Sequence, residues 1–482
     1  MIYDLLVIGG GINGAGIARD AAGRGLATIL VERGDLAGAT SSASSKLIHG
    51  GLRYLEQFEW RLVAEALAER EILLRTAGHL AWPVRFVIPH VPELRPRWMI
   101  RLGLFLYDHL ARRSLLPASQ AVRLDKGPYG SGLQPRLKRG FVYSDCRVDD
   151  ARLVVANALD ARRRGARIVV RSECLMARRD GAVWRARLSS GEQINARAIV
   201  NAAGPWVKHV LNERLGQATG DAVRLVKGSH IVLPRLYEGE HAFILQNDDR
   251  RVVFIIPFED DFTLIGTTDV PVTDADAPAA TSEEVRYLCA AASRYLARPL
   301  EAAQVRWRYA GVRPLYDDGS ADPSAVTRDY TLRIDDAERR APVLSVFGGK
   351  ITTYRHLAEQ ALKKLGPYFP GMKGAWTAGV ALPGSAFADR GAARDELLQR
   401  YRLLPAAIVR GVFRRHGSES AAVLGEGHLG EHFGGGLTER EMHYLCEHEW
   451  ASCAEDVLWR RTKCGLHMTA TQHRRVAEVM GR

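Results

Sequence analysis

Residues 1–33 carry the pattern that most constrains how this chain can fold. An apolar run at residues 4–8, "DLLVI", is followed by a glycine-rich turn and an amphipathic helical pattern, "GGGINGAGIARDAAGRG". The segment "ATILVER" then has the composition of a second strand and ends in an acid followed by an arginine. This order predicts a βαβ unit, and therefore a parallel sheet at the start of the chain.

The glycines of this turn have the spacing G-x-G-x-x-G, at Gly9, Gly11 and Gly14. Glycines permit a tight turn and a close backbone approach, and the N-terminus of the following helix presents N–H groups to a pyrophosphate. Glu32, at the end of the second strand, can accept hydrogen bonds from ribose hydroxyls. Because strand, spacing, helix and acid agree, we predict a bound adenine dinucleotide; the alternative is an ordinary glycine-rich turn.

The segment after Glu32 favours FAD over NAD. Residues 34–55, "GDLAGATSSASSKLIHGGLRYL", supply hydroxyls, a lysine, a histidine and two glycines where an NAD-binding chain would usually continue its alternation. The segment resembles the loop that carries pyrophosphate and flavin contacts in the D-amino-acid-oxidase-like flavoprotein superfamily. Residues 196–206, "ARAIVNAAGPW", resemble the second flavin-domain motif of that superfamily. The alternative is a solvated serine-rich linker.

A narrower resemblance covers nearly the whole chain. It is to the bacterial FAD-dependent, respiratory (aerobic) glycerol-3-phosphate dehydrogenases, whose motifs occur here in the expected order: "GGGINGAGIARDAAGRG", "SSKLIHGGLRYLE", "YSDCRVDDARLV", "NAAGPW", "KGSHIVLP", "IGTTD", "GVRPL", "TRDYTL", "SVFGGKITTYR" and "LWRRTK". The resemblance implies oxidation of sn-glycerol 3-phosphate to dihydroxyacetone phosphate, with electrons passing from non-covalently bound FAD to a membrane quinone. It also implies a homodimer, attached peripherally to the inner face of the cytoplasmic membrane.

The expected fold class is α/β plus α+β in three parts. Residues 1–80, 140–215 and 335–375 are expected to form a discontinuous Rossmann-like FAD-binding domain, because "ARAIVNAAGPW" and "PVLSVFGGK" resemble buried strands that return to the parallel sheet. Residues 81–139 and 216–334 are expected to form a substrate domain around an antiparallel sheet. The pattern becomes strongly helical near residue 386, so residues 386–482 are expected to form an all-helical C-terminal domain.

The resemblance also implies a set of site residues. Those expected at the cofactor are Gly9, Gly11, Asn13, Gly14, Glu32, Arg33, Thr40, Ser41, Ser42, Lys46, Leu47, His49, Gly50, Gly51, Cys174, Ala203, Gly204, Trp206, Gly348, Gly349, Lys350 and Thr352. Those expected at the substrate are Arg53, Tyr54, Arg313, Arg328 and Lys350.

The reaction itself demands a cationic site and a base. A phosphate dianion favours arginine for its forked donors, and Arg53, Arg313 and Arg328 stand in motif surroundings rather than on charged helix faces. The hydroxyl at C2 must lose its proton, and His230 is the leading candidate base because its ordinary pKa is near neutral. The alternative is a structural strand histidine. Arg313 would orient the substrate oxygen, and Tyr54 could donate to the phosphate.

Lys350 follows a strand and two glycines in "SVFGGKITTYR". The spacing does not fit a nucleoside-triphosphate loop, because no Ser or Thr follows the lysine directly. A reduced flavin gathers negative charge at its N1 and O2 edge, which favours a cation or a helix N-terminus nearby. We therefore expect this turn, with Thr352, to face the flavin edge and the substrate, and we count Lys350 with His230 and Arg313 as catalytic. The alternative is a glycine turn with an exposed lysine.

Charge and cysteines limit the partners. The formal net charge of +12 fits an anionic substrate, an acidic membrane or nucleic acid. Nucleic acid is disfavoured because the chain has no run of five or six basic residues and no nucleic-acid-binding motif. The six cysteines form no C-x-x-C pair, so no metal site is expected. The N-terminus lacks the features of a signal peptide, so we expect a cytoplasmic protein.

Residues 95–113, "RPRWMIRLGLFLYDHLARR", are the candidate membrane contact. Their aromatic and aliphatic side chains with flanking arginines suit an interfacial helix on anionic lipid. A buried core helix or a dimer contact remains the alternative.

Three rival functions stay open. A glycerol-3-phosphate oxidase would pass its electrons to oxygen, and an amine or amino-acid oxidase would need one carboxylate-binding arginine rather than a cluster of cations. A non-catalytic flavoprotein could bind RNA or protein through the basic segments "RRTK" and "QHRR" of the C-terminal region.

Overall fold

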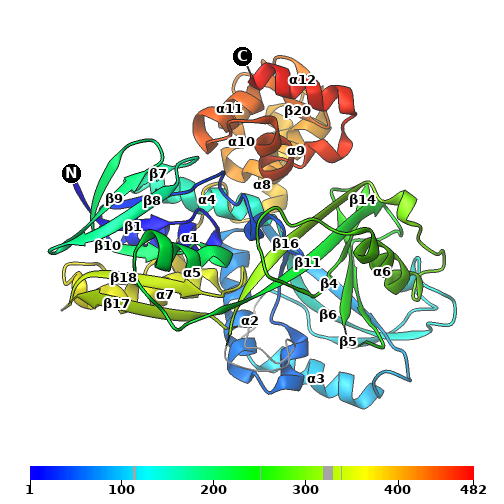
Figure 1. Cartoon of the computed structure of the whole chain (residues 1–482). Coiled ribbons are helices and arrows are strands. Elements are labelled where there is room, and N and C mark those ends of the chain that lie inside the picture. Colours follow the sequence, from blue (N-terminus) through cyan, green and yellow to red (C-terminus); the bar gives the residue numbers. More distant parts are fainter. Residues whose placement is uncertain (112–114, 250, 318–328, 338, 482) are drawn as a thin grey trace.

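The computed structural model describes residues 1–111, 115–249, 251–317, 329–337 and 339–481, which form two sheet domains and a helical C-terminal domain (Figure 1). The side chain of Arg53 and the whole of Arg328 lie outside the described part.

The first domain is built on a mostly parallel sheet with the strand order β17-β18-β10-β1-β2-β7. Strand β1 (Ile2–Ile8) lies between β10 (Gln193–Asn201) and β2 (Thr28–Val31), and it is parallel to both. Strands β18 (Arg340–Phe347) and β7 (Arg167–Val169) extend the parallel part, whereas β17 (Thr331–Ala337) is antiparallel to β18. The antiparallel strands β8 (Cys174–Asp180) and β9 (Val183–Leu188) attach to the first half of β10.

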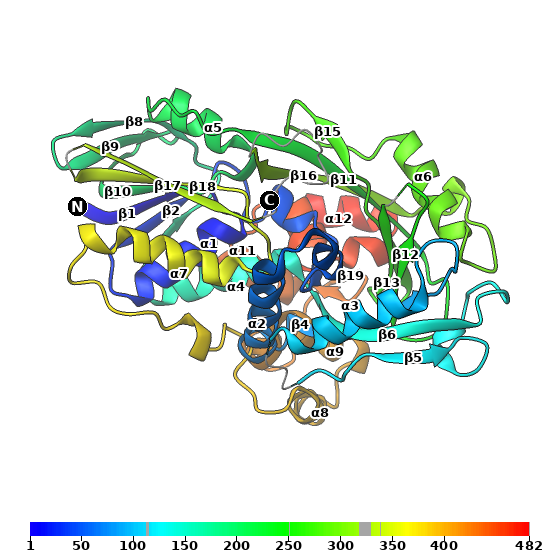
Figure 2. The ribbon, with the colours of Figure 1, turned by 90° about the horizontal axis from the view of Figure 1, so that it is seen from below.

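Helices α1 (Ile12–Gly23), α4 (Asp150–Arg163) and α7 (Tyr354–Leu365) cover one face of this sheet, as Figure 2 shows from below. The four residues of β2 are all buried, as expected for a central parallel strand with both faces covered. The expected return of residues 196–206 and 342–350 to the parallel sheet is confirmed by the pairing of β10 and β18 with each other and of β10 with β1.

The second domain contains a ten-stranded, mainly antiparallel sheet with the order β15-β11-β14-β13-β12-β4-β6-β3, to which β16 and β5 add. Its strands are β3 (Leu47–Ile48), β4 (Ala81–Pro89), β5 (Gln120–Arg123), β6 (Arg139–Val148), β11 (Val223–Pro234), β12 (Ala242–Gln246), β13 (Val252–Phe258), β14 (Phe262–Gly266), β15 (Val270–Val272) and β16 (Trp307–Tyr316).

Alternate residues of these strands face two separate cores. Ile231 and Leu233 pack in the core beneath α6 (Ser282–Ser293), and Val232 packs in the core beneath α2 (Trp60–Thr76) and α3 (Arg97–His109). This period of two is the geometry of a strand covered on both faces.

Two strands cross the expected domain boundaries. Strand β6 lies, apart from its first residue, within residues 140–215, expected in the FAD-binding domain, but it pairs with β4 from Gly140 to Val148 in the second sheet. Strand β17 falls mostly within residues 216–334, expected in the substrate domain, but it pairs with β18 in the first sheet. Pairing with a strand distant in the sequence decides the placement of β6, whereas β17 is placed by its antiparallel pairing with the next strand, β18.

The C-terminal domain contains α8 (Arg390–Arg400), α9 (Ala406–His416), α10 (Ser420–Leu424), α11 (Glu439–Glu449) and α12 (Ala470–Met480), with a short hairpin of β19 (His432–Gly434) and β20 (Leu437–Thr438). It has apolar clusters of its own, one around Leu445 and Val457 and another around Val409 and Val412. The expected fold class is confirmed in all three parts, except that the hairpin adds two short strands to the helical domain.

Candidate active site

The glycine turn is packed too tightly to accept side chains. Gly9 has φ of +113°, and a Cβ atom there would lie 2.5 Å from the Ala202 carbonyl oxygen of the neighbouring strand end. A Cβ atom on Gly14 would overlap the carbonyl oxygen of Gly9. Strand β1, the turn and helix α1 are therefore close together, which is the arrangement in which a phosphate group can approach a helix N-terminus.

Glu32 organises the loop at the end of β2. Its Oε2 accepts a hydrogen bond from the Gly10 N–H at 2.6 Å, and its Oε1 accepts one from the Gly34 N–H at 2.7 Å. Burial raises the pKa of this carboxyl, while the two N–H donors oppose that rise. The carboxylate thus holds the glycine turn against the second strand and keeps unused lone pairs for a ribose.

Arg33 and Trp206, which are far apart in the sequence, meet beside this turn. The Arg33 guanidinium lies 4.0 Å from the centre of the Trp206 ring, and the Trp206 Nε1–H donates to Asp276 at 3.0 Å. Ala203 and Gly204 directly follow β10 and lead into this tryptophan. Cys174 starts β8 and is buried in the same apolar cluster as Val31, and burial raises the pKa of its thiol to about 11.

Residues 40–47 join three elements. The Thr40 hydroxyl donates to the Val312 carbonyl of β16 at 2.6 Å, and the Ser41 Oγ accepts from the Ile12 N–H of α1 at 3.0 Å. Ser42 lies in the same short 3₁₀ turn, and Leu47 begins β3. The Lys46 ammonium donates to the Ser42 carbonyl at 2.8 Å and to Asp150 of α4 at 2.8 and 2.9 Å. The ammonium of Lys46 is thus engaged by protein groups, a feature that its place in the motif does not disclose.

The turn after β18 meets the start of α1 and the end of β3. Asn13 donates through Nδ2 to the Gly348 carbonyl at 3.2 Å, and its Oδ1 is buried with no hydrogen-bond partner among the described residues. Gly348 and Gly349 have φ of +79° and +107°, conformations that favour glycine. The His49 N–H donates to the Thr352 Oγ1 at 3.3 Å. The expected strand, glycine turn and helix are all present.

Gly50 and Gly51 fix the other end of this loop. The Gly50 N–H donates to the Tyr107 hydroxyl of α3 at 2.8 Å. Gly51 has φ of +79°, and a Cβ atom there would overlap the Tyr54 ring. Tyr54 is buried, and the Lys350 ammonium lies 4.0 Å from the centre of its ring.

His230, on β11, is buried beside residues 44–46. Its Nε2 lies 2.9 Å from the Ser45 Oγ, and its ring stacks on Tyr309 with 4.8 Å between centroids and 13° between planes. Its Nδ1 is buried and has no partner in the described part of the chain. Burial, and then the charges of Lys46 and Arg313, hold the pKa of the imidazole well below its usual value, so that it is neutral at neutral pH.

Arg313 lies on β16, four residues after Tyr309, and is half-buried. Its Nη2 donates to the Asp269 carboxylate at 2.6 Å and to the Thr268 carbonyl at 3.0 Å. A Cβ atom on Gly348 would lie 3.7 Å from the carbonyl oxygen of Pro314, the next residue. The Arg313 strand and the Lys350 turn are therefore adjacent. Arg53 and Arg328 cannot be placed with them, because the Arg53 side chain and all of Arg328 lie outside the described residues.

Several residues around this site were missed by sequence reasoning. Asp269, Ser45, Asp150, Tyr107 and Tyr309 all contact predicted site residues. Ser45, Asp150 and Asp269 stand inside the quoted motifs "SSKLIHGG", "DDARLV" and "IGTTD", which is the one signal that could have found them.

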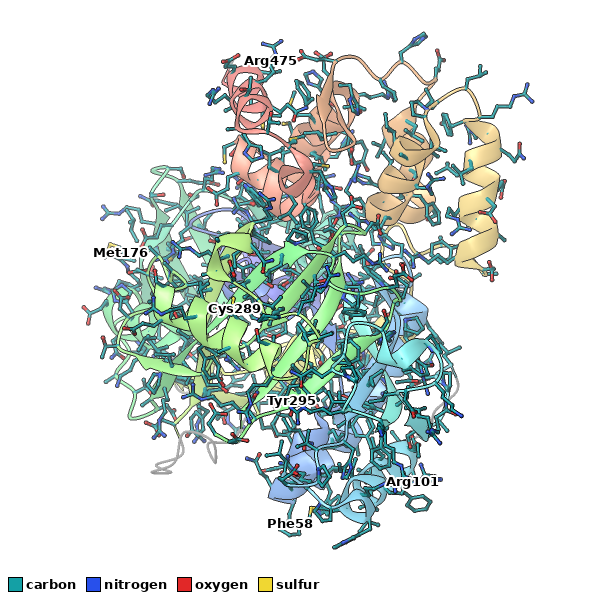
Figure 3. All side chains as sticks on the ribbon, turned by 90° about the vertical axis from the view of Figure 1, so that its right-hand side faces the viewer. Phe58, Arg101, Met176, Cys289, Tyr295 and Arg475 are labelled. Atoms are coloured by element: carbon teal, nitrogen blue, oxygen red, sulfur yellow. The ribbon has the colours of Figure 1, made fainter. Side chains whose placement is uncertain are left out.

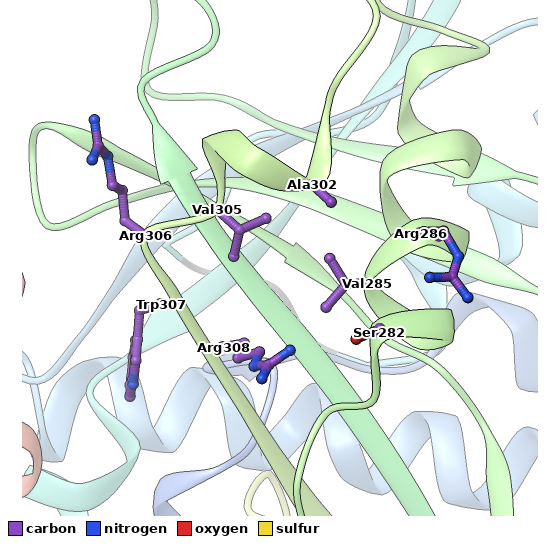
Figure 4. Close-up of a pocket in the computed structure, with 8 residues that line it drawn as sticks. All are labelled: Ser282, Val285, Arg286, Ala302, Val305, Arg306, Trp307 and Arg308. Carbon is purple, nitrogen blue, oxygen red and sulfur yellow. The ribbon is translucent and has the colours of Figure 1, made fainter.

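A cavity of about 550 Å³ lies elsewhere in the second domain (Figure 4). It lies between α6 and β16 and is lined by Ser282, Val285, Arg286, Ala302, Val305, Arg306, Trp307 and Arg308. None of the predicted site residues lines it. No His, Cys, Asp or Glu side chains within the described ranges gather in a way that could hold a metal ion.

The geometry brings the neutral buried imidazole of His230 close to Arg313, and it places the Arg313 strand beside the turn that precedes Lys350. A turn without room for side chains and an unpartnered Asn13 oxygen fit a dinucleotide that approaches the backbone closely. The imidazole can accept a proton, and Arg313 and Lys350 can attract an anion. These features suit oxidation of a phosphorylated alcohol.

Comparison with known proteins identifies relatives that are flavin-dependent oxidoreductases. Residues 4–355 match the family model described as FAD dependent oxidoreductase, and residues 375–482 match the one described as the C-terminal domain of alpha-glycerophosphate oxidase. A glycerol-3-phosphate dehydrogenase of Pseudomonas aeruginosa is 52% identical, over 99% of this chain and 95% of its own. A D-erythritol 1-phosphate dehydrogenase of Brucella abortus is 48% identical, over 97% of this chain and 96% of its own.

Among solved structures, the glycerol-3-phosphate dehydrogenase from Bacillus halodurans complexed with FAD superposes with a TM-score of 0.75 at 27% identity. The match covers 100% of this chain and 91% of that one. The three-part architecture is therefore shared over the full length.

Proposed function

Because this chain belongs to the family of FAD-dependent oxidoreductases, we propose that it oxidises sn-glycerol 3-phosphate to dihydroxyacetone phosphate and passes the electrons to a membrane quinone. The predicted resemblance to FAD-dependent glycerol-3-phosphate dehydrogenases is confirmed, and FAD is the cofactor. The observation that supports the substrate proposal is the proximity of Arg313 to His230, on a strand adjacent to the turn of residues 348–349 that precedes Lys350.

The residues that would hold FAD come from three separated segments. Gly9, Gly11, Gly14 and Asn13 offer a helix N-terminus to the pyrophosphate, and Glu32 offers a carboxylate to the ribose. Residues 40–51 and 348–352 would flank the flavin ring. When bound, FAD supplies the hydride acceptor. Binding through backbone donors and glycine turns requires no covalent link.

His230 would remove the proton from the C2 hydroxyl. A general base must be unprotonated to act, and the low pKa of this buried imidazole meets that requirement. The Nδ1 atom has no protein partner among the described residues and could receive the proton. Arg313 would orient the substrate oxygen, while Asp269 fixes the guanidinium.

Lys350 and Tyr54 would bind the phosphate, with Arg53 and Arg328 as further candidates from the motifs. Lys350 is held over the Tyr54 ring, an arrangement that keeps the ammonium close to the tyrosine. Its position after Gly349 also places it near the expected flavin edge.

Helix α3 supports the proposed membrane contact. It buries Ile100, Leu104 and Tyr107 against the core, but exposes four other apolar side chains: Trp98 (66% exposed), Met99 (41%), Leu102 (50%) and Phe105 (53%). Phe58 lies at the same end of the molecule as Arg101 of α3 (Figure 3) and is 76% exposed. An apolar surface with arginines suits insertion among anionic lipid headgroups, where a quinone would be reached.

Within the described residues, none of the helices is both long and apolar enough to cross a membrane. From the exposed apolar side of α3 we propose peripheral attachment at the inner face of the cytoplasmic membrane, and from the family resemblance we propose a homodimer. Binding to vesicles of anionic lipid, together with the mass of the enzyme in solution, tests both statements.

The test of the reaction is anaerobic mixing of the yellow holoenzyme with sn-glycerol 3-phosphate. Flavin absorbance near 450 nm should bleach, and a soluble quinone analogue should restore it. Persistent colour would contradict the substrate proposal. Rapid recovery with oxygen alone would favour the oxidase, and bleaching by an amine would favour an amine oxidase.

A second substrate is favoured by one comparison. The Brucella abortus relative is 48% identical and is named for D-erythritol 1-phosphate, which also carries a secondary alcohol and a phosphate. Titration of the same flavin signal with both compounds distinguishes the two substrates. The proposal requires that the second-order rate constant of flavin reduction be higher with sn-glycerol 3-phosphate than with D-erythritol 1-phosphate.

A further inference from the structure

Two buried lysines from different domains pair with two neighbouring aspartates. Lys46 donates to Asp150 at 2.8 Å, and Lys463 of the C-terminal domain donates to Asp149 at 3.2 Å. Asp149 also caps α4 by accepting the Arg152 N–H at 3.2 Å. Both lysines are less than 5% exposed, and the charge of Lys463 contributes to lowering the pKa of Lys46, after burial. The two ion pairs are therefore electrostatically coupled.

Lys46 also faces the aromatic ring on which His230 is stacked. Its ammonium lies 5.1 Å from the centre of the Tyr309 ring, and Tyr309 stacks on His230 at 4.8 Å. The Tyr309 hydroxyl donates to the Ser44 carbonyl at 2.9 Å, and Ser45 lies 2.9 Å from His230. Residues 44–46 thus contact the tyrosine and the histidine and carry the cation that faces them.

We propose that Lys46 and Lys463 are positioning residues for His230, so that the C-terminal domain holds a cation beside the active-site imidazole and keeps that imidazole unprotonated. The inference rests on the proposed function only where it names His230 as the base. The coupling between Lys463 of the C-terminal domain and the protonation of the buried His230 does not depend on the proposed reaction.

The physical basis is the balance of charges. A cation near an imidazole disfavours its protonated form. Among the described residues, the charged groups that act on His230 are Lys46 and Arg313. Those around Lys46 are Asp149, Asp150 and Lys463. If Lys463 is removed, Asp149 becomes available to Lys46 and draws its ammonium away from Tyr309, so that His230 accepts a proton more easily.

The rival explanation is that Lys463 only docks the C-terminal domain. Other buried pairs already perform that task. Arg461 makes two hydrogen bonds to Asp35, both at 2.7 Å, and Arg152 pairs with Glu449. Glu449 does not contact Lys46, Tyr309 or His230 in any described interaction, so Glu449→Gln is a control that disturbs domain docking while the Lys463–Asp149 hydrogen bond keeps both of its partners.

The experiment follows the titration of His230 by NMR in histidine-labelled holoenzyme, with His230→Asn to identify its signal. In Lys463→Met, the pKa of His230 should rise by about one unit relative to the parent enzyme. Lys463→Arg should restore the parent value, and Glu449→Gln should leave it unchanged. The rate of anaerobic flavin reduction decreases at low pH, and the midpoint of this decrease should move to higher pH by the same amount.

A second variant keeps the inference falsifiable if Lys463→Met fails to fold. Lys46→Met combined with Asp150→Asn removes the cation and its partner together, and it should also raise the pKa of His230. An unchanged titration in the folded variants would overturn the inference, as would an equal shift in Glu449→Gln. Because NMR needs no substrate, failure of the proposed reaction shows separately, as an absence of flavin bleaching in the parent enzyme.

Discussion

The ammonium of Lys350 lies 4.0 Å from the centre of the Tyr54 ring, although the two residues are far apart in the sequence. The contact joins the glycine turn after β18 to the loop that follows β3, and we propose that the ammonium faces the substrate phosphate.

Replacement of Lys350 tests that direction. In Lys350→Met, a charge-assisted contact to phosphate is lost, which costs about 1.5–3 kcal/mol and raises KM for sn-glycerol 3-phosphate by about 10- to 100-fold. Lys350→Arg should retain most of the affinity. Steady-state kinetics with a quinone analogue measures both, and an unchanged KM in Lys350→Met would remove the phosphate role from this residue.

Replacement of His230 tests the base. His230→Asn should keep bound FAD but slow anaerobic flavin reduction by about 10²- to 10⁴-fold, the usual contribution of a general base. Because the pKa of His230 is held below its usual value, the parent enzyme should keep its reduction rate down to pH values below the ordinary imidazole range. His432→Gln, on the exposed start of β19, serves as the control and should have parental kinetics.

Glu32 provides a test of the cofactor site. In Glu32→Gln, the new amide has a single oxygen acceptor for the Gly10 and Gly34 N–H groups, so one buried donor loses its partner at a cost of about 1–3 kcal/mol. We expect weaker FAD binding by about tenfold or more, measured by the quenching of flavin fluorescence on titration of the apoprotein. Parental affinity would contradict the role given to this carboxylate.

The exposed side of α3 can be changed without touching the core. Leu102→Gln with Phe105→Gln should reduce binding to anionic vesicles by about tenfold or more, because each apolar side chain loses its transfer into lipid. Flavin reduction by substrate should not change. Leu403→Gln is the matched control, since Leu403 is 93% exposed in the C-terminal domain, far along the chain from α3. Equal loss of binding in the control would point to a non-specific surface effect.

A buried carboxylate makes the stability of the C-terminal domain depend on pH. Burial alone would raise the pKa of Glu441, but Arg415 and His416 lower it to about 2. A carboxyl whose folded pKa is depressed stabilises the fold above its unfolded value, and that stabilisation is lost as the pH falls toward the folded value. The melting temperature should therefore exceed that of Glu441→Gln at pH 6, and the difference should shrink below about pH 4.5. A constant difference would contradict this coupling.

Local pattern was sufficient for much of this protein. The spacing of Gly9, Gly11 and Gly14 between two strands predicted the βαβ unit, because turn geometry and helix periodicity depend on neighbours in the chain. The same holds for the turn at Gly348 and Gly349 and for the helices beyond residue 386. Motif order added the family and the cofactor.

Sequence reasoning was weaker wherever the partner of a charge stands far away in the chain. It named Lys46 without its partner Asp150, to which the ammonium donates. It named Arg313 without Asp269, and His230 without Tyr309. It also missed that β6 pairs within the second sheet.

The sequence by itself determined the dinucleotide-binding turn, the FAD-dependent family and the three-part division of the chain, since these depend on local spacing and motif order. Only the tertiary structure decided which carboxylates and aromatic rings the buried cations and His230 contact. The ion pair of Lys463 with Asp149 and the stacking of His230 on Tyr309 join residues from different elements. Such contacts follow from sheet order and domain packing, which bring distant residues within a few ångströms of each other in a buried environment where charge interactions are strong.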